Sequence, residues 1–365
     1  MTPRLLHVFP SFAVGGAQMR LIAVANHFGH RLDHTIVALD GDTAAAAALA
    51  PGLAVRFPAL DARKGDTLGS VRRYAATLRT LRPDVLVTHN WGSIEWAMAN
   101  ALAGRRHVHI EDGFGPEERT RQLPRRVLTR RLVLRRATVV LPSRTLWRLA
   151  TGTWRLPERR VRYVPNGIDL ARFAPAPPDA ADAAPRAVPV IGTVAGLRPE
   201  KNVARLLRAV AALPAGLPAR LTIVGEGPER PALAALAATL GIAGRVTFAG
   251  HLAAPEQAYR AFDLFALSSD TEQMPLSVLE AMASGLAVAA SDVGDVAEML
   301  AVPNRRFAVP REDAALSAAL AALLADPALR RDLGAANRAR AEAAFDQATM
   351  FAAYGGLFGL QPATG

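Results

Sequence analysis

Two basic residues follow the first strand expected in the second half of the chain. Val190–Val194 is a short, β-rich apolar run, and Arg198 and Lys201 stand in the polar turn directly after it. Ligands of open α/β sheets bind at the carboxyl ends of the strands. Two cations at such an edge can neutralise a pyrophosphate, because the arginine fork binds two oxygens and the lysine adds a point charge. The alternative is a solvated basic turn, but Lys201 is one of only two lysines in the chain.

Two acidic residues follow a later strand. Glu272 stands in the polar loop after the apolar run Leu264–Leu267, and Glu280 lies inside a helix expected over Leu276–Ser284. Pro275 suits the first turn of that helix, where free amide N–H groups can bind an anion. Both glutamates could face one crevice and contact sugar and ribose hydroxyls. The structural alternative is that Glu272 complements the helix dipole and that Glu280 is solvated.

Two glycine loops follow other strands. Gly15 and Gly16 come between the apolar run Leu5–Phe9 and a helix-like segment, and Gly225 follows the run Leu221–Val224. Glycine after a strand lets a ligand approach the backbone closely. The loop at Gly225 lacks the third glycine of the dinucleotide fingerprint, which disfavours an NAD-dependent dehydrogenase.

Parallel sheets would position these loops. Short apolar runs alternate with helix-like segments, and most of the runs are continuous, as in strands buried on both faces. The pattern predicts an α/β fold with two Rossmann-like, doubly wound parallel-sheet domains. The segment FAPAPPDAADAAPRAVP interrupts this pattern and indicates a linker. We therefore expect domains at 1–172 and 190–342, a linker at 173–189, and a last helical segment at 343–365.

Composition narrows the class of protein further. The 365 residues are 51% hydrophobic and 21% charged, which suits a large buried core. No apolar run reaches the ~20 residues of a membrane-spanning helix, and the N-terminus lacks the pattern of a secretory signal. The absence of cysteine excludes disulfides and thiolate metal sites, and a cytoplasmic location is expected. The net charge of +11 favours anionic partners.

Taken together, these motifs resemble the retaining glycosyltransferases of family 4, which have the GT-B fold. The likeness rests on Val164–Asp169 before the linker, the turn from Gly192 to Asn202, the loop Ile223–Pro228, the glutamates Glu272 and Glu280 with seven residues between them, and Gly285–Val288. It extends over nearly the whole chain. It implies two domains that face a central cleft, with the segment 343–365 returning to the first domain.

The resemblance implies a nucleoside-diphosphate sugar as the donor, UDP or GDP, and an acceptor hydroxyl on a glycan or glycolipid in cell-surface polysaccharide biosynthesis. Arg198 and Lys201 would bind the diphosphate, Glu280 the ribose and Glu272 the donor sugar. The other implied donor contacts are Gly15, Gly16, Gly225, Leu252, Met274, Pro275 and Leu276. Arg198, Lys201 and Glu272 would also act in catalysis. Arg198, Lys201 and helix N-termini would stabilise the charge on the departing diphosphate, so that neither a metal nor a cofactor is required.

One catalytic position departs from the family pattern. Many relatives have histidine before the glycine that follows the expected fourth strand, whereas this chain has Asp112 before Gly113. Asp112 is our candidate for that catalytic role, and His109 and Glu111 are the alternatives. An Asp-Gly pair also commonly caps a turn. Gln273 replaces the usual glycine after Glu272, which could alter the geometry of the loop or the choice of sugar.

A basic segment lies in the first half. Glu117–Arg136 contains eight arginines, with an apolar stripe formed by Leu123, Val127, Leu128, Leu132 and Leu134. A basic amphipathic helix can lie on an anionic membrane, which would place the protein at the inner face of the cell membrane. The alternative is a solvated helix in an arginine-rich protein. Nucleic acid is not expected as a partner, because no reader motif appears and no aromatic residues are interleaved with the arginines.

Two other functions remain open at this stage. A nucleotide-sugar epimerase of the same fold would act on the same donor without an acceptor. A catalytically inactive, membrane-associated glycan-binding protein would keep the fold and lose the reaction. The changes at Asp112 and Gln273 favour the inactive protein, and the presence of Arg198, Lys201 and both glutamates argues against it.

Overall fold

The computed structural model describes residues 2–60, 66–118, 121–176 and 188–360. The chain divides into two compact units, of which the first combines Met1–Asn166 with Ala348–Gly365 and the second is Gly167–Gln347. The second unit is thus inserted between two parts of the first. Most of the linker expected at 173–189 lies outside the described residues, since 177–187 are not among them.

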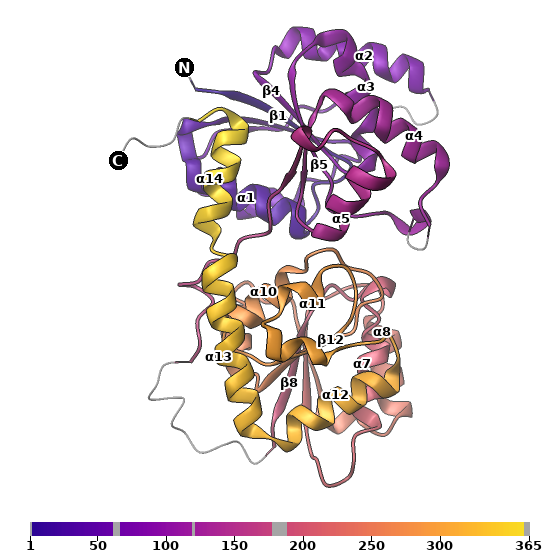
Figure 1. The fold of residues 1–365 in the computed structure, drawn as a ribbon, viewed down its shortest axis with the longest axis vertical. Helices are drawn as coiled ribbons and strands as arrows, with labels where there is room; N and C mark the ends of the chain where they lie inside the picture. Colours follow the sequence, from indigo (N-terminus) through magenta and orange to yellow (C-terminus); the bar gives the residue numbers. More distant parts are fainter. Residues whose placement is uncertain (1, 61–65, 119–120, 177–187, 361–365) are drawn as a thin grey trace. The chain divides into compact units, whose positions relative to one another are not determined.

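The first unit is built on a seven-stranded parallel sheet (Figure 1). Its strand order is β3-β2-β1-β4-β5-β6-β7, so the chain leaves β1 in one direction and continues from β4 in the other. This reversal makes the sheet doubly wound, and ligand crevices form beside such a reversal at the carboxyl ends of the strands. The strands are β1 (Arg4–Phe9), β2 (Asp33–Ala38), β3 (Val55–Arg56), β4 (Val85–His89), β5 (Arg106–Ile110), β6 (Thr138–Leu141) and β7 (Val161–Tyr163).

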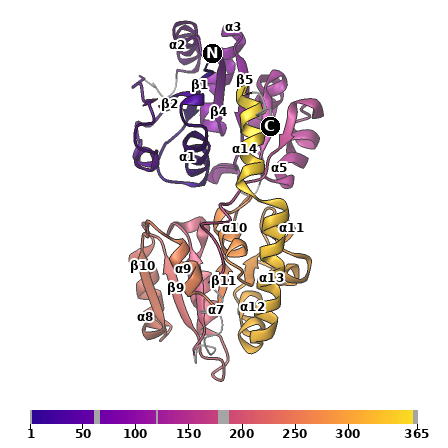
Figure 2. The ribbon, with the colours of Figure 1, turned by 90° about the vertical axis from the view of Figure 1, so that its left-hand side faces the viewer.

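Helices cover both faces of this sheet. Apolar side chains of α2 and α3 pack on one face, and those of α1 and α14 pack on the other. Figure 2 shows α14 beside α1 on the same face. The helices are α1 (Gly16–Phe28), α2 (Thr67–Leu81), α3 (Ile94–Ala103), α4 (Pro124–Val133), α5 (Arg144–Arg148) and α14 (Gln347–Phe358).

The last helical segment returns to the first sheet. Met350, Phe351, Tyr354 and Phe358 of α14 are buried in the same apolar cluster as side chains of β1, β4 and β5. The sequence predicted one helix here, but the structure ends α13 (Pro327–Ala344) before α14 begins. The Phe345 N–H still bonds to the Ala341 carbonyl, but the Phe345 carbonyl accepts from the Ile168 N–H at 2.8 Å and the Gln347 N–H donates to the Ile168 carbonyl at 3.1 Å, which separates the two helices.

The second unit has a six-stranded parallel sheet in the order β10-β9-β8-β11-β12-β13, again reversed next to its first strand. The prediction of two Rossmann-like, doubly wound parallel sheets is therefore confirmed. The strands are β8 (Val190–Val194), β9 (Arg220–Val224), β10 (Val246–Gly250), β11 (Leu264–Leu267), β12 (Val288–Ser291) and β13 (Ala308–Val309).

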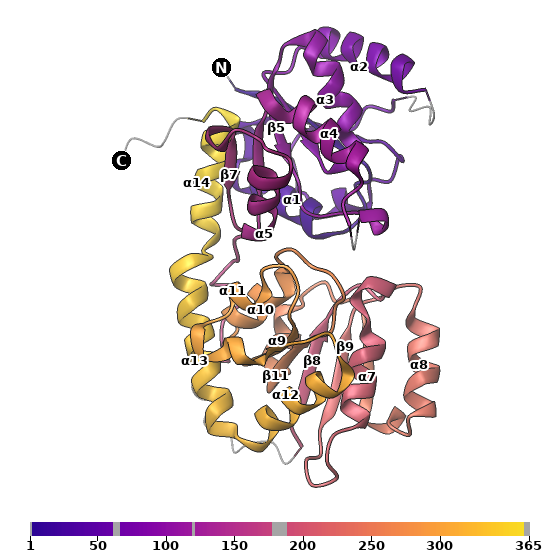
Figure 3. The same cartoon turned by 45° about the vertical axis from the view of Figure 1, so that its right-hand side comes forward.

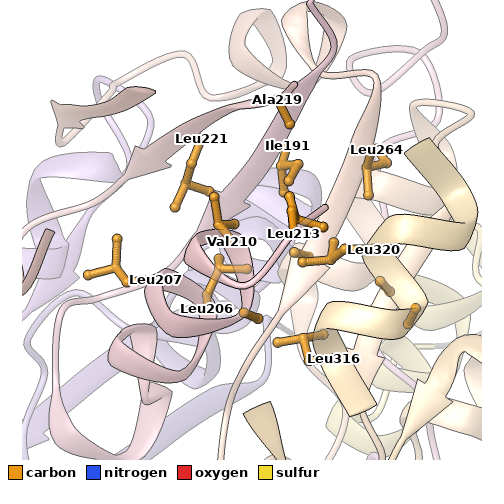
Figure 4. Close-up of a cluster of buried hydrophobic side chains, with 14 of the residues drawn as sticks. Ile191, Leu206, Leu207, Val210, Leu213, Ala219, Leu221, Leu264, Leu316 and Leu320 are labelled. Carbon is orange, nitrogen blue, oxygen red and sulfur yellow. The ribbon is translucent and has the colours of Figure 1, made fainter. Parts of the chain in front are cut away.

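Two apolar layers enclose this second sheet. The helices α7 (Val203–Ala211), α8 (Arg230–Thr239) and α12 (Asp313–Ala325) contribute to one layer, and α9 (Glu256–Ala261), α10 (Leu276–Ala283) and α11 (Val296–Met299) contribute to the other (Figure 3). Figure 4 shows the first layer, where side chains of β8, β9 and β11 meet those of α7 and α12. This packing fixes the strand ends that carry the polar loops.

A row of buried histidines crosses the first sheet. His7 contacts His34 at 3.2 Å and His89 at 3.4 Å through ring nitrogens, and all three have at most 1% of their surface exposed. Burial, followed by the nearby imidazole of His34, lowers the pKa of His7 well below its usual value. Burial likewise lowers the pKa of His34 to about 4 and that of His107 to about 3. These imidazoles are therefore neutral in the folded protein at neutral pH.

We expect the stability of the first unit to fall in mild acid. The unfolded chain binds protons to these histidines near pH 6.5, whereas the folded chain does so only near pH 4 or below. The contribution of the neutral histidines to the unfolding free energy is fully present above pH 6.5. It falls by about 1.4 kcal/mol per pH unit for each histidine as the pH drops towards 4. Urea unfolding followed by tryptophan fluorescence measures this, because all four tryptophans lie between residues 91 and 154.

A variant pair separates this effect from general acid denaturation. His34→Gln should reduce the pH dependence of the unfolding free energy between pH 6.5 and 4 by the contribution of one histidine, about 1.4 kcal/mol per pH unit. His30→Gln, which changes an exposed histidine of the same unit, should leave the slope unchanged. Equal slopes in the two variants would contradict the assignment.

Candidate functional site

The turn after β8 is fixed by its own backbone. Pro199–Lys201 forms one turn of 3₁₀ helix, and Asn202 follows in the left-handed conformation with a φ of 40°. The Asn202 side chain accepts a hydrogen bond from the N–H of Arg205, which caps the start of α7. Ser268, at the end of β11, donates to the carbonyl of Lys201 at 3.1 Å. The lysine is thus held between the carboxyl ends of two adjacent strands.

Lys201 and Glu272 form an ion pair at this edge. The Lys201 Nζ lies 2.5 Å from Glu272 Oε1, and the Ser269 hydroxyl donates to the same oxygen at 2.8 Å. The side chains are 19% and 11% exposed, so both are largely withdrawn from solvent yet reachable from it. The sequence placed the two residues 71 positions apart along the chain, and the structure brings them into contact.

Arg198 is more exposed than the lysine. Its side chain is 58% exposed and its Nε lies 3.0 Å from Glu200 Oε1. A surface pair of this kind contributes little to stability, so the arginine can exchange Glu200 for another anion at small cost. Arg198 therefore stands at the open side of the turn, and Lys201 at its inner side.

The start of α10 presents backbone donors, although the N–H of Val278 already bonds to the Pro275 carbonyl at 3.2 Å. Pro275 precedes the helix, which has no side-chain cap, so the N–H groups of its first turn lack side-chain partners there. Met274 is 5% exposed and its side chain packs in the apolar core, so only its backbone could meet a ligand. This helix end lies directly after the Glu272 loop and adds a positive dipole end to the cationic side chains.

Glu280 has a partner that the sequence did not reveal. The Tyr259 hydroxyl of α9 lies 2.6 Å from Glu280 Oε2 and 3.2 Å from the Ser277 carbonyl oxygen, and its one proton goes to the nearer carboxylate oxygen. Burial raises the pKa of Glu280, while the hydrogen bond from Tyr259 and the charge of Arg172 oppose that rise. Glu280 as a whole residue is half-buried.

Two glycines shape these loops for steric reasons. Gly225 has a φ of 132°, and a Cβ there would lie 1.9 Å from the Ala195 carbonyl oxygen. A side chain at Gly225 would therefore clash with the loop after β8. Glycine is needed here for this structural reason, in addition to the ligand contact that we predicted. Gly294, which the sequence analysis missed, has a φ of 57°, and a Cβ there would lie 2.3 Å from the Glu272 carbonyl oxygen.

In the first unit, Asp112 is bound by a buried arginine. Arg20 of α1 lies 2.6 Å from one Asp112 oxygen through Nη1 and 2.8 Å from the other through Nη2. Nη1 also donates to Asn166 at 2.8 Å, and the Asn90 side chain accepts from the Asp112 N–H at 2.7 Å. Burial alone would lower the pKa of Arg20, but the charge of Asp112 raises it overall.

The alternatives to Asp112 lie deeper in the protein. His109 and Glu111 have no exposed surface, whereas the Asp112 side chain is 16% exposed. Glu111 Oε2 lies 3.4 Å from the Arg130 guanidinium, and Arg130 is itself fully buried and bidentate to Glu118. Only Asp112 among these three candidates has surface that a substrate could touch in this structure.

Gly15 and Gly16 open α1 without a side-chain cap. Gly15 is extended, with a φ of −168°, and no side chain bonds to the first turn of the helix. A Cβ at Gly15 would lie 2.8 Å from the Gln18 side-chain oxygen, so the loop is tight at this point. These amides lie after β1, at the same sheet edge as Asp112 after β5.

The predicted residues therefore divide between the two units, and among their described side chains only Lys201 and Glu272 form an ion pair with each other. The second unit holds Arg198, Lys201, Gly225, Leu252, Glu272, Met274, Pro275, Leu276 and Glu280; the first unit holds Gly15, Gly16 and Asp112. Leu252 packs against the apolar core of the second unit. Residues missed from sequence are Arg20, Tyr259, Ser269 and Gly294. Within the ranges that the structure covers, no cluster of three or more His, Asp or Glu side chains could hold a metal ion.

Comparison with known proteins identifies the class. A family model described as "Glycosyl transferases group 1" matches residues 180–340, and one described as "Glycosyltransferase Family 4" matches residues 14–172. The chain belongs to this family of glycosyltransferases, and the resemblance noted from its motifs is confirmed.

Among curated relatives, D-inositol 3-phosphate glycosyltransferase of Nocardia farcinica is 33% identical over 69% of this chain and 61% of its own length. The putative glycosyltransferase EpsF of Bacillus subtilis is 33% identical over 54% of each chain. The match thus spans about half to three-fifths of these relatives. Anabaena HepE, solved in complex with UDP, shares 21% identity with a TM-score of 0.79 over 97% of this chain and 98% of its own, which supports the GT-B fold.

The buried Arg20–Asp112 pair gives a prediction about stability. Arg20→Met leaves the Asp112 carboxylate and the Asn166 side chain without their cation, and we expect a loss of about 3 kcal/mol in the unfolding free energy of the first unit. Arg4→Met removes one partner of a half-exposed pair with Asp84 and should cost less than about 1 kcal/mol. Tryptophan-monitored urea unfolding compares the two, and equal losses would contradict a special role for Arg20.

Proposed function

We propose that the protein is a retaining glycosyltransferase that moves a hexose from a nucleoside-diphosphate sugar, with UDP or GDP as the nucleotide, to a hydroxyl of a glycan or glycolipid. The observation that carries the proposal is the Lys201–Glu272 pair at the carboxyl edge of β8 and β11, next to the uncapped start of α10. A cation, a helix dipole and a sugar-binding carboxylate are thus adjacent. A role in cell-surface polysaccharide biosynthesis is part of the proposal.

Charge stabilisation would supply most of the catalysis. In the transfer, the bond between the anomeric carbon and the diphosphate breaks, the acceptor oxygen bonds to that carbon, and the acceptor's hydroxyl proton passes to an oxygen of the departing diphosphate. Negative charge grows on that diphosphate as its bond to carbon breaks. Lys201, Arg198 and the N–H groups at the start of α10 are positioned to meet that charge, as preorganised donors do in other transfer reactions. In this scheme the protein's own cations neutralise the leaving group, and neither a metal nor a cofactor is required.

The carboxylates have separate tasks in the proposal. Glu272, which Lys201 and Ser269 hold through one oxygen, keeps its other oxygen for hydroxyls of the donor sugar. Glu280 would accept from the ribose. Asp112, whose two carboxylate oxygens both bind Arg20, would contact the sugar near the reacting carbon. Amides at Gly15 and Gly16 would face the diphosphate.

Lys201 provides the direct test of nucleotide binding. We expect UDP or GDP to bind with a favourable enthalpy in titration calorimetry, and Lys201→Ala to weaken that binding about 10- to 100-fold through the loss of a charge-assisted contact. Arg220→Ala is the matched control, because Arg220 is an exposed cation at the amino end of β9, away from the strand ends that carry the site. Equal affinities of the two variants, or binding of NAD alone, would refute the proposal.

Radiolabelled nucleotide sugars distinguish the reaction from its alternatives. A glycosyltransferase releases the nucleotide by transfer to an acceptor or by slow hydrolysis, whereas an epimerase yields an isomeric nucleotide sugar. A protein that binds nucleotide sugars and turns over none of them would be the inactive, glycan-binding form.

Association with an anionic membrane is a further part of the proposal, and the outward face of α4 supports it. Leu128 and Leu132 are 55% and 65% exposed, whereas Arg130 of the same helix is fully buried in its pair with Glu118. Exposed arginines flank the two leucines at positions 121, 125, 131, 135 and 136. Residues 119–120 of the predicted segment lie outside the described residues. In the parts of the chain that the structure covers, no helix could cross a bilayer.

Vesicle binding tests this face. The protein should co-sediment with vesicles containing phosphatidylglycerol and much less with phosphatidylcholine alone, because each arginine near an anionic surface contributes about 1 kcal/mol. Leu128→Ser with Leu132→Ser should weaken binding, whereas Leu102→Ser, which changes a leucine that is 57% exposed on α3, should not. Equal binding of both vesicle types would contradict the membrane assignment.

A further inference from the structure

The contact between Tyr259 and Glu280 joins two helices of the second unit. Tyr259 lies on α9 and Glu280 on α10, 21 positions later, and the hydroxyl lies 2.6 Å from Glu280 Oε2. The phenol ring has no exposed surface. Three rings surround it, those of Phe173, Phe262 and Phe265, with centroids 5.7 to 5.8 Å away. A ring packed in this way cannot turn away from the carboxylate.

The tyrosine acts as the donor in this pair. Burial and the neighbouring carboxylate raise the pKa of Tyr259 well above its usual value, so the hydroxyl keeps its proton at neutral pH. Since Oε2 of Glu280 is engaged, the free lone pairs of the carboxylate lie mainly on Oε1. No hydrogen-bond partner for Oε1 occurs among the residues described, and Glu280 is partly exposed.

A glutamate on a helix surface ordinarily samples several rotamers, and a ligand that needs one of them must offset the loss of that freedom. The hydrogen bond from the tightly packed Tyr259 ring restricts Glu280 to few rotamers before a ligand binds. Arg172, whose charge favours the ionised form of Glu280, pairs with Glu256 at 2.9 Å and makes no hydrogen bond to Glu280 in this structure.

We propose that Tyr259 is a positioning residue that fixes Glu280 Oε2, so that Oε1 is held ready to accept a hydrogen bond from a ribose hydroxyl of the nucleotide. The inference rests on the proposed function, because it takes the ligand of Glu280 to be a nucleotide. Under this inference, Glu280 contacts the ribose, and Tyr259 strengthens the preference for ribose over deoxyribose without contacting the nucleotide.

The competing explanation is that Tyr259 only fills the core. It predicts that losing the hydroxyl changes stability and weakens all ligands alike. The positioning role predicts a selective effect, in which the benefit from one ribose hydroxyl is lost while the remaining affinity is kept.

The test is a cycle of ligands and variants measured by titration calorimetry. The full-length protein is titrated with UDP, 2′-deoxy-UDP and 3′-deoxy-UDP, or with the GDP series if GDP binds better. In the unmodified protein, we expect removal of the hydroxyl that Glu280 accepts to weaken binding about tenfold. In Tyr259→Phe, which keeps the ring and removes only the hydroxyl, that penalty should shrink to about twofold or less.

Leu320→Val is the control, because Leu320 is fully buried in the other apolar layer of the second sheet and lies outside the cluster that holds Tyr259. It should retain the full penalty even where it lowers the melting temperature. An undiminished penalty in Tyr259→Phe overturns the positioning role and leaves the proposed function intact. Binding of UDP without any deoxy penalty in the unmodified protein overturns the inference through Glu280. No binding of any nucleotide overturns the inference together with the proposed function.

Discussion

The pairing of Lys201 with Glu272 is the interaction on which the candidate site depends. A lysine with little exposed surface loses part of its hydration, and here a carboxylate from the next strand end is its partner. The same contact draws the loop after β11 against the turn after β8, and Ser268, Ser269 and Gly294 hold that arrangement through backbone and hydroxyl contacts. A diphosphate would meet a cation that is already fixed in place.

Each unit contains an ion pair that is largely buried, but the more accessible partner differs between the two units. In the second unit the cation is partly accessible and the carboxylate supports it; in the first unit Arg20 is buried and the carboxylate of Asp112 is the accessible partner. An arginine suits the buried position because it satisfies Asp112 through two parallel bonds and has a third acceptor in Asn166. The sign of the charge offered to a ligand is therefore opposite in the two groups.

Much of the fold was predictable because buried parallel strands leave continuous apolar runs. Val190–Val194 and Leu264–Leu267 were predicted with the bounds that the structure gives to β8 and β11. The two-residue β3 was missed, since Val55–Arg56 has too little pattern to detect. Glu272 and Glu280 stood out through their spacing, whereas Arg20 and Tyr259 gain their roles from partners distant in sequence.

The path of the chain has a consequence for biosynthesis. Because α14 is made only after the inserted unit, the face of the first sheet beside α1 lacks this helix while that unit is being translated. The side chains of β4 and β5 that later meet Phe351 and Phe358 are made long before α14, with nearly two thirds of the chain still to be translated between β5 and that helix. During that time the apolar flank is exposed, and exposed apolar surface favours self-association of a nascent chain.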